Sequence, residues 1–225
     1  MQKVLRRIRE KIEEFTGYKI IKLPSGISYD RNFMTFQNFF KSIRNVEGDI
    51  VECGVGYGKT FLILTRLVHL EKKGRNIWGF DSFEGFPEPT IHDKSPRNPN
   101  KGDWGNTSKE RILKYLIQYG IEPSFIKKYI KIVKGFFNES LDKYNDRSIA
   151  LLHLDCDLYE SYKVCLERLW PKVTEGGVVL FDEYKSPTAF KAFPGASKAI
   201  DEYFGQMQKK IRLNEFANKY YIFKT

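Results

Sequence analysis

Two patterns of hydrophobic and polar positions alternate along the chain after about residue 48. Short apolar runs that are rich in β-branched and aromatic residues predict strands. Longer stretches with apolar residues three and four positions apart predict the helices that separate them. The expected strands cover residues 49–54, 76–81, 129–133, 148–155 and 176–182, and the expected helices lie near 59–72, 107–119, 158–169 and 195–209.

This alternation of strand and helix favours a parallel sheet with helices on both faces, which is the α/β class. The end of the chain differs. Residues 211–216 and 220–223 are separated by Ala217-Asn218-Lys219, which predicts a hairpin and thus an antiparallel edge. The sequence therefore predicts a mostly parallel, seven-stranded sheet that closes with a C-terminal antiparallel hairpin.

The 225 residues suffice for one substantial core and favour a single domain, 1–225, with an N-terminal helical extension (1–47) and an α/β core (48–225). The extension begins with a basic amphipathic helix, whose apolar positions are Val4, Ile8, Ile12 and Phe15. Such a helix can lie on a membrane, but its glutamates dilute the charge. We expect it to dock on the domain or on a second subunit, which would give a homo-oligomer.

The formal net charge of +10 suits nucleic acid, an anionic membrane or an acidic small substrate. The lysines are scattered and no recognised nucleic-acid motif is present, so we expect no nucleic-acid partner. No apolar run is long enough for a transmembrane segment or a signal peptide, and we expect a cytoplasmic protein. Three cysteines without metal-ligand spacing indicate buried thiols: Cys53, Cys156 and Cys165.

The stretch VECGVGYGKT (51–60) ends like a loop that binds the phosphates of ATP or GTP. That loop needs glycine where this chain has Cys53, and a dinucleotide-binding turn needs glycine where it has Lys59. Glycine instead alternates behind the acidic Glu52, at Gly54, Gly56 and Gly58. The pattern suits a backbone bend that lies against a nucleoside, with a carboxylate that accepts from an amino group.

Acidic residues mark the predicted carboxyl ends of the strands. Asp81 ends the second strand, where an acid accepts hydrogen bonds from ribose hydroxyls in nucleoside-binding α/β folds. Any single one of these acids could simply cap the helix that follows. Together they would repel one another unless a positive charge lies among them. The set comprises Glu52, Asp81, Asp155, Asp182 and Glu183, with Asp157 just beyond a strand end.

His153, Asp155 and Asp157 follow one another with period two, which would point them to one side of an extended backbone. Two such carboxylates suit a hard divalent cation plus a general base, and oxygen ligands favour Mg²⁺ over zinc. Asp182 and Glu183 can reach one ion only if their strand stops before them. His153 is expected to be a packed or hydrogen-bonded histidine.

A long loop between Phe86 and Thr107 contains four prolines and two glycines and shows no periodicity. Loops of this length in compact domains are disordered or functional, and its place after the second strand favours a lid or an acceptor-binding role. Trp104 is its expected apolar contact. Its basic residues favour an acidic acceptor: Lys94, Arg97 and Lys101.

With these residues identified, five stretches resemble motifs of the macrocin O-methyltransferase family. Members of this family methylate sugar hydroxyls with S-adenosylmethionine and a divalent metal. The matching stretches span most of residues 30–205 and are GDIVECGV (48–55), FDSFEGFPEP (80–89), KGFFNESL (134–141), LHLDCDLYES (152–161) and GGVVLFDEY (176–184).

The resemblance implies a Rossmann-like class I methyltransferase that acts on a small-molecule or glycan acceptor. It implies that Asp157 is the general base and that Mg²⁺ or a similar cation is bound by Asp155, Asp182 and Glu183. It also implies that the methyl donor is bound by Glu52, Gly54, Gly56, Tyr57, Gly58, Thr60, Asp81, Ser82 and Phe136.

Two positions depart from the family pattern. Gly56-Tyr57 stands where the family has a bulky Trp-Arg pair, and Glu183 stands where it has a second aspartate. Three other hypotheses stay open: methylation of a catechol or another small acceptor, a nucleotide triphosphatase or kinase, and a basic binding module without catalysis.

Overall fold

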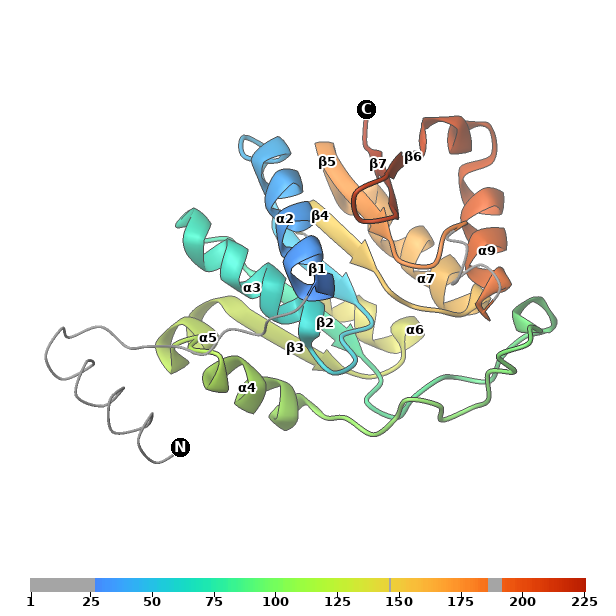
Figure 1. Cartoon of the computed structure of the whole chain (residues 1–225), viewed down its shortest axis with the longest axis horizontal. Helices are drawn as coiled ribbons and strands as arrows, with labels where there is room; N and C mark the ends of the chain where they lie inside the picture. The colour runs from blue at the N-terminus through green and yellow to red at the C-terminus, as the bar shows by residue number, and fades with distance from the viewer. Residues whose placement is uncertain (1–26, 146, 186–191) are drawn as a thin grey trace, which may run out of the picture.

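The computed structural model describes residues 27–145, 147–185 and 192–225, and their side chains from residue 30 onward. A central sheet of seven strands has the order β3-β2-β1-β4-β5-β7-β6 (Figure 1). The first five strands are parallel, and β7 runs antiparallel to both β5 and β6. The strands are β1 (Asp49–Cys53), β2 (Ile77–Asp81), β3 (Ile130–Lys134), β4 (Ile149–Leu154), β5 (Val173–Phe181), β6 (Arg212–Asn214) and β7 (Lys219–Phe223).

Helices cover both faces of this sheet (Figure 1). One face packs against α2 (Ile27–Ser42), α3 (Lys59–Glu71), α4 (Lys109–Gln118) and α5 (Pro123–Tyr129). The other packs against α6 (Phe137–Ser140), α7 (Tyr159–Leu169) and α9 (Pro194–Phe204).

Each face has its own hydrophobic core, because successive side chains of a strand point to opposite faces. Ile50 joins the core beneath α2 and α3, and its neighbour Val51 joins the core beneath α7 and α9. β4 is buried along its whole length, which is typical of a central parallel strand. The expected α/β class, the parallel sheet and the antiparallel hairpin are confirmed.

Several element boundaries differ from the expected ones for local reasons. β5 begins at Val173, three residues before the predicted start at 176. The residues that follow Val173 are polar and partly exposed, so the first part of the strand lacks the apolar run on which the prediction rests. The helix expected at 195–209 is an α-helix only as far as Phe204, because Gly205 has a positive φ of 49°, and a 3₁₀ helix follows over Gly205–Lys210. Lys219, expected in the hairpin turn, is the first residue of β7.

Within the described ranges, two α-helices were not predicted. α5 has seven residues, none of them fully buried, and α6 has four. Such short helices lack the repeated apolar positions on which a sequence-based assignment rests. The amphipathic helix expected over the first fifteen residues lies outside the described residues.

Among the described residues, no helix combines the length and the apolar character that crossing a membrane requires.

Candidate active site

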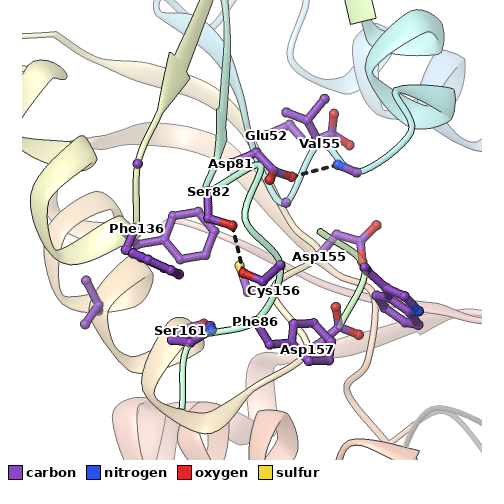
Figure 2. Close-up of a pocket in the computed structure, with 18 of the residues that line it drawn as sticks. Glu52, Val55, Asp81, Ser82, Phe86, Phe136, Asp155, Cys156, Asp157 and Ser161 are labelled. Atoms are coloured by element: carbon purple, nitrogen blue, oxygen red, sulfur yellow. Dashed lines mark hydrogen bonds between the residues drawn. The ribbon is translucent and has the colours of Figure 1, made fainter. Parts of the chain in front are cut away.

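A cavity of ≈ 630 Å³ opens at the carboxyl ends of four neighbouring parallel strands, β3, β2, β1 and β4. Ligands bind at this edge in open α/β sheets. Figure 2 shows acidic side chains from three of these strand ends around it. Eight of the nine expected donor-binding residues line it: Glu52, Gly54, Gly56, Tyr57, Thr60, Asp81, Ser82 and Phe136. Asp155 and Asp157 also line it.

The glycine turn after β1 is bent tightly against the end of β4. Gly54 has a φ of 87°, and a Cβ there would lie 1.7 Å from the carbonyl oxygen of Asp155. Gly56 also has a positive φ, but a Cβ on it would meet no described atom within 4 Å. Gly54 therefore permits close approach of two backbones, and Gly56 leaves open space at the cavity wall.

Gly58 is the expected donor-binding residue that does not line the cavity. It is the N-cap of α3, with a left-handed φ of 80°, and an added Cβ would lie 3.0 Å from the side chain of Ile112. Its position explains why the Gly-Lys-Thr ending resembles a phosphate loop: these residues form the first turn of a helix. Lys59 is exposed and, like Thr60, reaches the cavity.

Asp81 fixes the glycine turn. Its Oδ2 accepts a hydrogen bond from the Gly56 amide at 2.8 Å (Figure 2), and its Oδ1 accepts one from the Phe83 amide at 2.7 Å. Burial raises the pKa of this carboxyl, and the backbone amides oppose that shift. Each carboxylate oxygen can accept more than one bond, so the side chain can also serve the ribose hydroxyls expected for it.

Glu52 lies at the base of the cavity and is 1% exposed. Its Oε1 lies 3.0 Å from Nδ1 of His153, and its Oε2 has no hydrogen-bond partner among the described residues. Burial raises the pKa of Glu52 to about 7, against the opposing effect of His153. A buried acceptor without a partner at a cavity wall fits the amino group of a bound ligand.

His153 is fully buried, as the sequence predicted for a packed and hydrogen-bonded histidine. Its ring meets Phe36 edge-on at a centroid distance of 5.2 Å. Its Nε2 lies 3.8 Å from Asp182 Oδ1. The histidine thus connects the floor of the cavity with the carboxylates that follow β4 and β5.

The carboxylates beyond β4 and β5 form two overlapping groups. The ligand atoms of His153, Asp155 and Asp182 lie within 4.8 Å of one another, and so do those of Asp155, Asp157 and Glu183. Asp155 belongs to both groups. Because carboxylate oxygens prefer hard cations, this donor chemistry fits Mg²⁺.

The backbone conformation that places Asp157 in this cluster differs from the expected one. β4 stops at Leu154 and Asp157 has a left-handed φ of 59°, so the backbone is not extended there. The two carboxylates come together because the chain turns. β5 stops at Phe181, and Asp182 and Glu183 therefore lie beyond the strand and turn to different members of the cluster.

Burial and mutual repulsion dominate the electrostatics of the second group. They raise the pKa values of Asp157 and Glu183 well above the usual range of carboxyls. Arg97 acts on Asp157 in the opposite direction, and the Tyr162 hydroxyl donates to Glu183. These effects compensate the group only in part, so a cation would stabilise it.

The 86–107 loop is held by contacts within itself and by hydrogen bonds to the rest of the fold, such as that from the Tyr159 amide to Asp93. The Phe86 amide donates to the Asp103 carbonyl at 3.0 Å, and Arg97 lies 4.7 Å from the centre of the Trp104 ring and 2.9 Å from Asp103. Trp104 lines the cavity, contacts Phe86 and stays half exposed, which agrees with its expected role as an apolar contact.

The basic residues of this loop differ in their surroundings. Arg97 is already held by Asp103 and by the aromatic rings, whereas Lys94 and Lys101 are exposed. The positive charge of this loop led us to expect an acidic acceptor. The two exposed lysines carry that charge more than Arg97 does.

Sequence patterns missed several residues that line the cavity on the side of α6 and α7. They come from a helix that was not predicted, from the turn after β4, or from a helix whose apolar face was assigned to the core. They are Phe137, Asn138, Glu139, Cys156, Glu160, Ser161 and Val164. All three cysteines are buried and free, as expected.

Residues 30–215 match the family described as macrocin-O-methyltransferase (TylF). The chain belongs to this family. A similar protein is demethyldecarbamoylnovobiocin O-methyltransferase of Streptomyces niveus, 28% identical over 71% of this chain and 59% of that protein. A second, from Streptomyces olivaceus, methylates a 2,3-dimethoxy-rhamnosyl tetracenomycin by its name and is 28% identical over 72% of this chain and 59% of the relative. This chain thus spans 59% of the length of these two relatives.

Solved structures agree with this assignment to the macrocin-O-methyltransferase family. A calicheamicin methyltransferase superposes with a TM-score of 0.75 and 25% identity, covering 85% of this chain and 78% of that one. The O-methyltransferase NovP superposes with a TM-score of 0.71 and 24% identity over 87% and 80% of the two chains, which supports the fold. The seven-stranded arrangement is therefore that of a class I methyltransferase.

Proposed function

We propose that this chain transfers a methyl group from S-adenosylmethionine to a sugar hydroxyl of a small-molecule or nucleotide-linked acceptor. The observation that carries the proposal is the shared cavity. It brings an amide-held Asp81, a Glu52 oxygen without a partner among the described residues and the Asp155–Asp157 pair together at one sheet edge. The relatives named above for rhamnosyl and novobiocin-type products support a sugar-bearing acceptor.

The donor side of the cavity would be formed by the glycine turn and β2. Glu52 Oε2 accepts from the donor's amino group, and Asp81 accepts from its ribose hydroxyls. The open space beside Gly56 admits the nucleoside, and Phe136 supplies an apolar wall. None of these groups clamps phosphate, which separates this site from that of a nucleotide triphosphatase.

The acceptor side would be formed by Asp157 and the 86–107 loop. Asp157 accepts the proton of the acceptor hydroxyl as its oxygen attacks the methyl group. Burial and the neighbouring charge of Asp155 raise the pKa of Asp157, which makes its carboxylate a stronger base. Trp104 and Phe86 line the cavity where an apolar part of the acceptor would pack.

A hard divalent cation held by Asp155 and Asp182 would lower the pKa of a hydroxyl bound to it. Glu183, the third expected ligand, lies in the other group of the cluster, with Asp157. The residues fit such an ion because two groups of oxygen-rich ligands meet at Asp155. Asp155 would hold the ion beside Asp157, so that binding of the acceptor and removal of its proton occur at one corner of the cavity.

Calorimetric titration with S-adenosylmethionine and, in parallel, with ATP tests the donor assignment. We expect donor binding and no ATP binding; ATP binding without donor binding would contradict the proposal. Mass-spectrometric detection of methyl transfer to nucleotide-linked deoxysugars, neutral glycosides and catechols then identifies the acceptor class. Methyl transfer to catechols alone would show that the acceptor is an aromatic diol and would contradict the proposed sugar acceptor.

The Asp157→Asn variant tests the base. We expect wild-type donor affinity and a loss of methyl transfer of at least about 100-fold, which is the usual contribution of a general base. Asp142→Asn is the matched control, because Asp142 is exposed and its ion pair is with Arg168, away from the cavity. Full activity of Asp157→Asn at saturating Mg²⁺ would refute the role.

A further inference from the structure

A buried lysine from the far end of the chain lies at the carboxylate edge. Lys219 opens β7, and its side chain is 9% exposed. Its ammonium group pairs with Oδ1 of Asp182. No motif of the family resemblance includes this residue.

Sheet register places the lysine there. β5 and β7 are antiparallel neighbours (Figure 1), and their last pair is Phe181 with Tyr220. One step further along the same register sets Asp182 opposite Lys219. The pair is therefore fixed by the closing hairpin of the fold and does not depend on a flexible surface side chain.

The surroundings of Lys219 are acidic. Burial lowers the pKa of Lys219, and the charges of Asp155 and Glu52 oppose only part of this shift. Asp182 also lies 3.8 Å from Nε2 of His153, a buried atom without a hydrogen-bond partner among the described residues. Lys219 thus supplies the positive charge on the His153–Asp155–Asp182 side of the cluster.

The other side of the cluster has no such contact. Among the described residues, Glu183 receives the Tyr162 hydroxyl, and Asp157 feels Arg97 at longer range. An ammonium group bound to Asp182 occupies a carboxylate oxygen that a divalent ion would need. It also repels a second cation placed between Asp182 and Asp155.

We propose that Lys219 is a built-in counter-cation that competes with the divalent ion for Asp182 and thereby sets the metal affinity of the site. The proposal rests on the proposed function, since it takes the carboxylate cluster as the metal site. It assigns Lys219 a positioning role toward Asp182, with no contact to the donor or the acceptor. The C-terminal hairpin then controls how firmly the ion is held.

Calorimetric titration of the full chain with Mn²⁺ tests this competition without an activity measurement. We expect Lys219→Met to bind Mn²⁺ at least about tenfold more tightly than the wild type, because a neighbouring positive charge is removed. Lys219→Arg keeps the charge and should bind like the wild type. Lys163→Met, an exposed lysine on α7, is the matched control and should leave the affinity unchanged.

A double-mutant cycle with Asp182→Asn separates competition from a general charge effect. If Lys219 acts through Asp182, Lys219→Met should gain less than about threefold in the Asp182→Asn background. A full gain of about tenfold there would overturn the proposal. Unchanged or weaker Mn²⁺ binding in Lys219→Met, with a native circular dichroism spectrum, would also overturn it.

The two proposals fail in different measurements. Loss of the proposed function would show as absent donor binding or absent methyl transfer in the wild type. Failure of the Lys219 proposal would show in the metal titrations, and absence of Mn²⁺ binding in both the wild type and Lys219→Met would count against it.

Discussion

Substitution of Gly54 by alanine should destabilise the fold far more than the same change at an unconfined glycine. Gly54 has a φ of 87°, and left-handed backbone costs a residue with a Cβ roughly 1–2 kcal/mol. The new Cβ would lie 1.7 Å from the Asp155 carbonyl oxygen, so the ends of β1 and β4 must move apart. Overpacking of this kind costs a further ~1–3 kcal/mol. The expected loss is therefore about 2–5 kcal/mol.

Urea unfolding followed by circular dichroism measures this loss. Gly102→Ala is the control, because Gly102 has a φ of 83° but an added Cβ meets no described atom within 4 Å. It should cost only the roughly 1–2 kcal/mol of the left-handed backbone. Gly56→Ala should resemble this control in stability and yet weaken donor binding, because its Cβ enters the cavity wall. A Gly54→Ala variant as stable as Gly102→Ala would refute the close-approach argument.

Three further predictions concern the cavity and its support. Since the pKa of Glu52 rises from 4.5 to about 7 on folding, its ionisation should reduce the free energy of unfolding as the pH rises through this window, by ~3 kcal/mol above pH 7. Urea titrations at several pH values should show that Glu52→Gln abolishes this decline in stability. The variant should also abolish the rise in donor affinity that we expect as Glu52 ionises. A pH dependence of stability and donor affinity that is unchanged in Glu52→Gln would contradict both expectations. Trp104→Ala should raise KM for the acceptor with little change in kcat, because the ring lines the cavity and supports Arg97; steady-state kinetics would count against this if kcat alone fell. Tyr162→Phe should cost ~1–3 kcal/mol in urea unfolding, since it removes the hydroxyl that donates to buried Glu183, whereas the half-buried Tyr203→Phe should cost little.

The architecture could be predicted because its signals are local. Each parallel strand is a short apolar run, most of these runs end at or just before an acid, and parallel strands gather those acids at one sheet edge. For this reason the sequence alone predicts that Glu52, Asp81 and Asp155 lie at a common edge. α5 and α6 escaped prediction because they are short and have few buried positions, and part of the cavity wall escaped with them.

The geometry within the site depended on turns that no pattern specifies. Period-two spacing predicted that Asp155 and Asp157 face one way on an extended strand, but they meet because Asp157 adopts a left-handed φ. A single sequence could not indicate that Asp182 and Glu183, adjacent in the chain, would join different halves of the cluster. Such details follow from where a strand stops, and boundaries are set by tertiary packing.

At the acidic sheet edge, the need for a positive charge could be predicted from the sequence, but the residue that supplies it could not. Several carboxylates at one sheet edge require a positive charge among them, and this followed from the sequence alone. Lys219 meets part of that requirement, although it lies 37 positions after Asp182 in the chain. Its place was hidden because the sequence pattern assigned it to a hairpin turn, whereas antiparallel pairing of β7 with β5 carries it to the edge. The same pairing joins the hairpin to the cation site, so a substitution that weakens the β5–β7 pairing should alter metal affinity without touching a ligand.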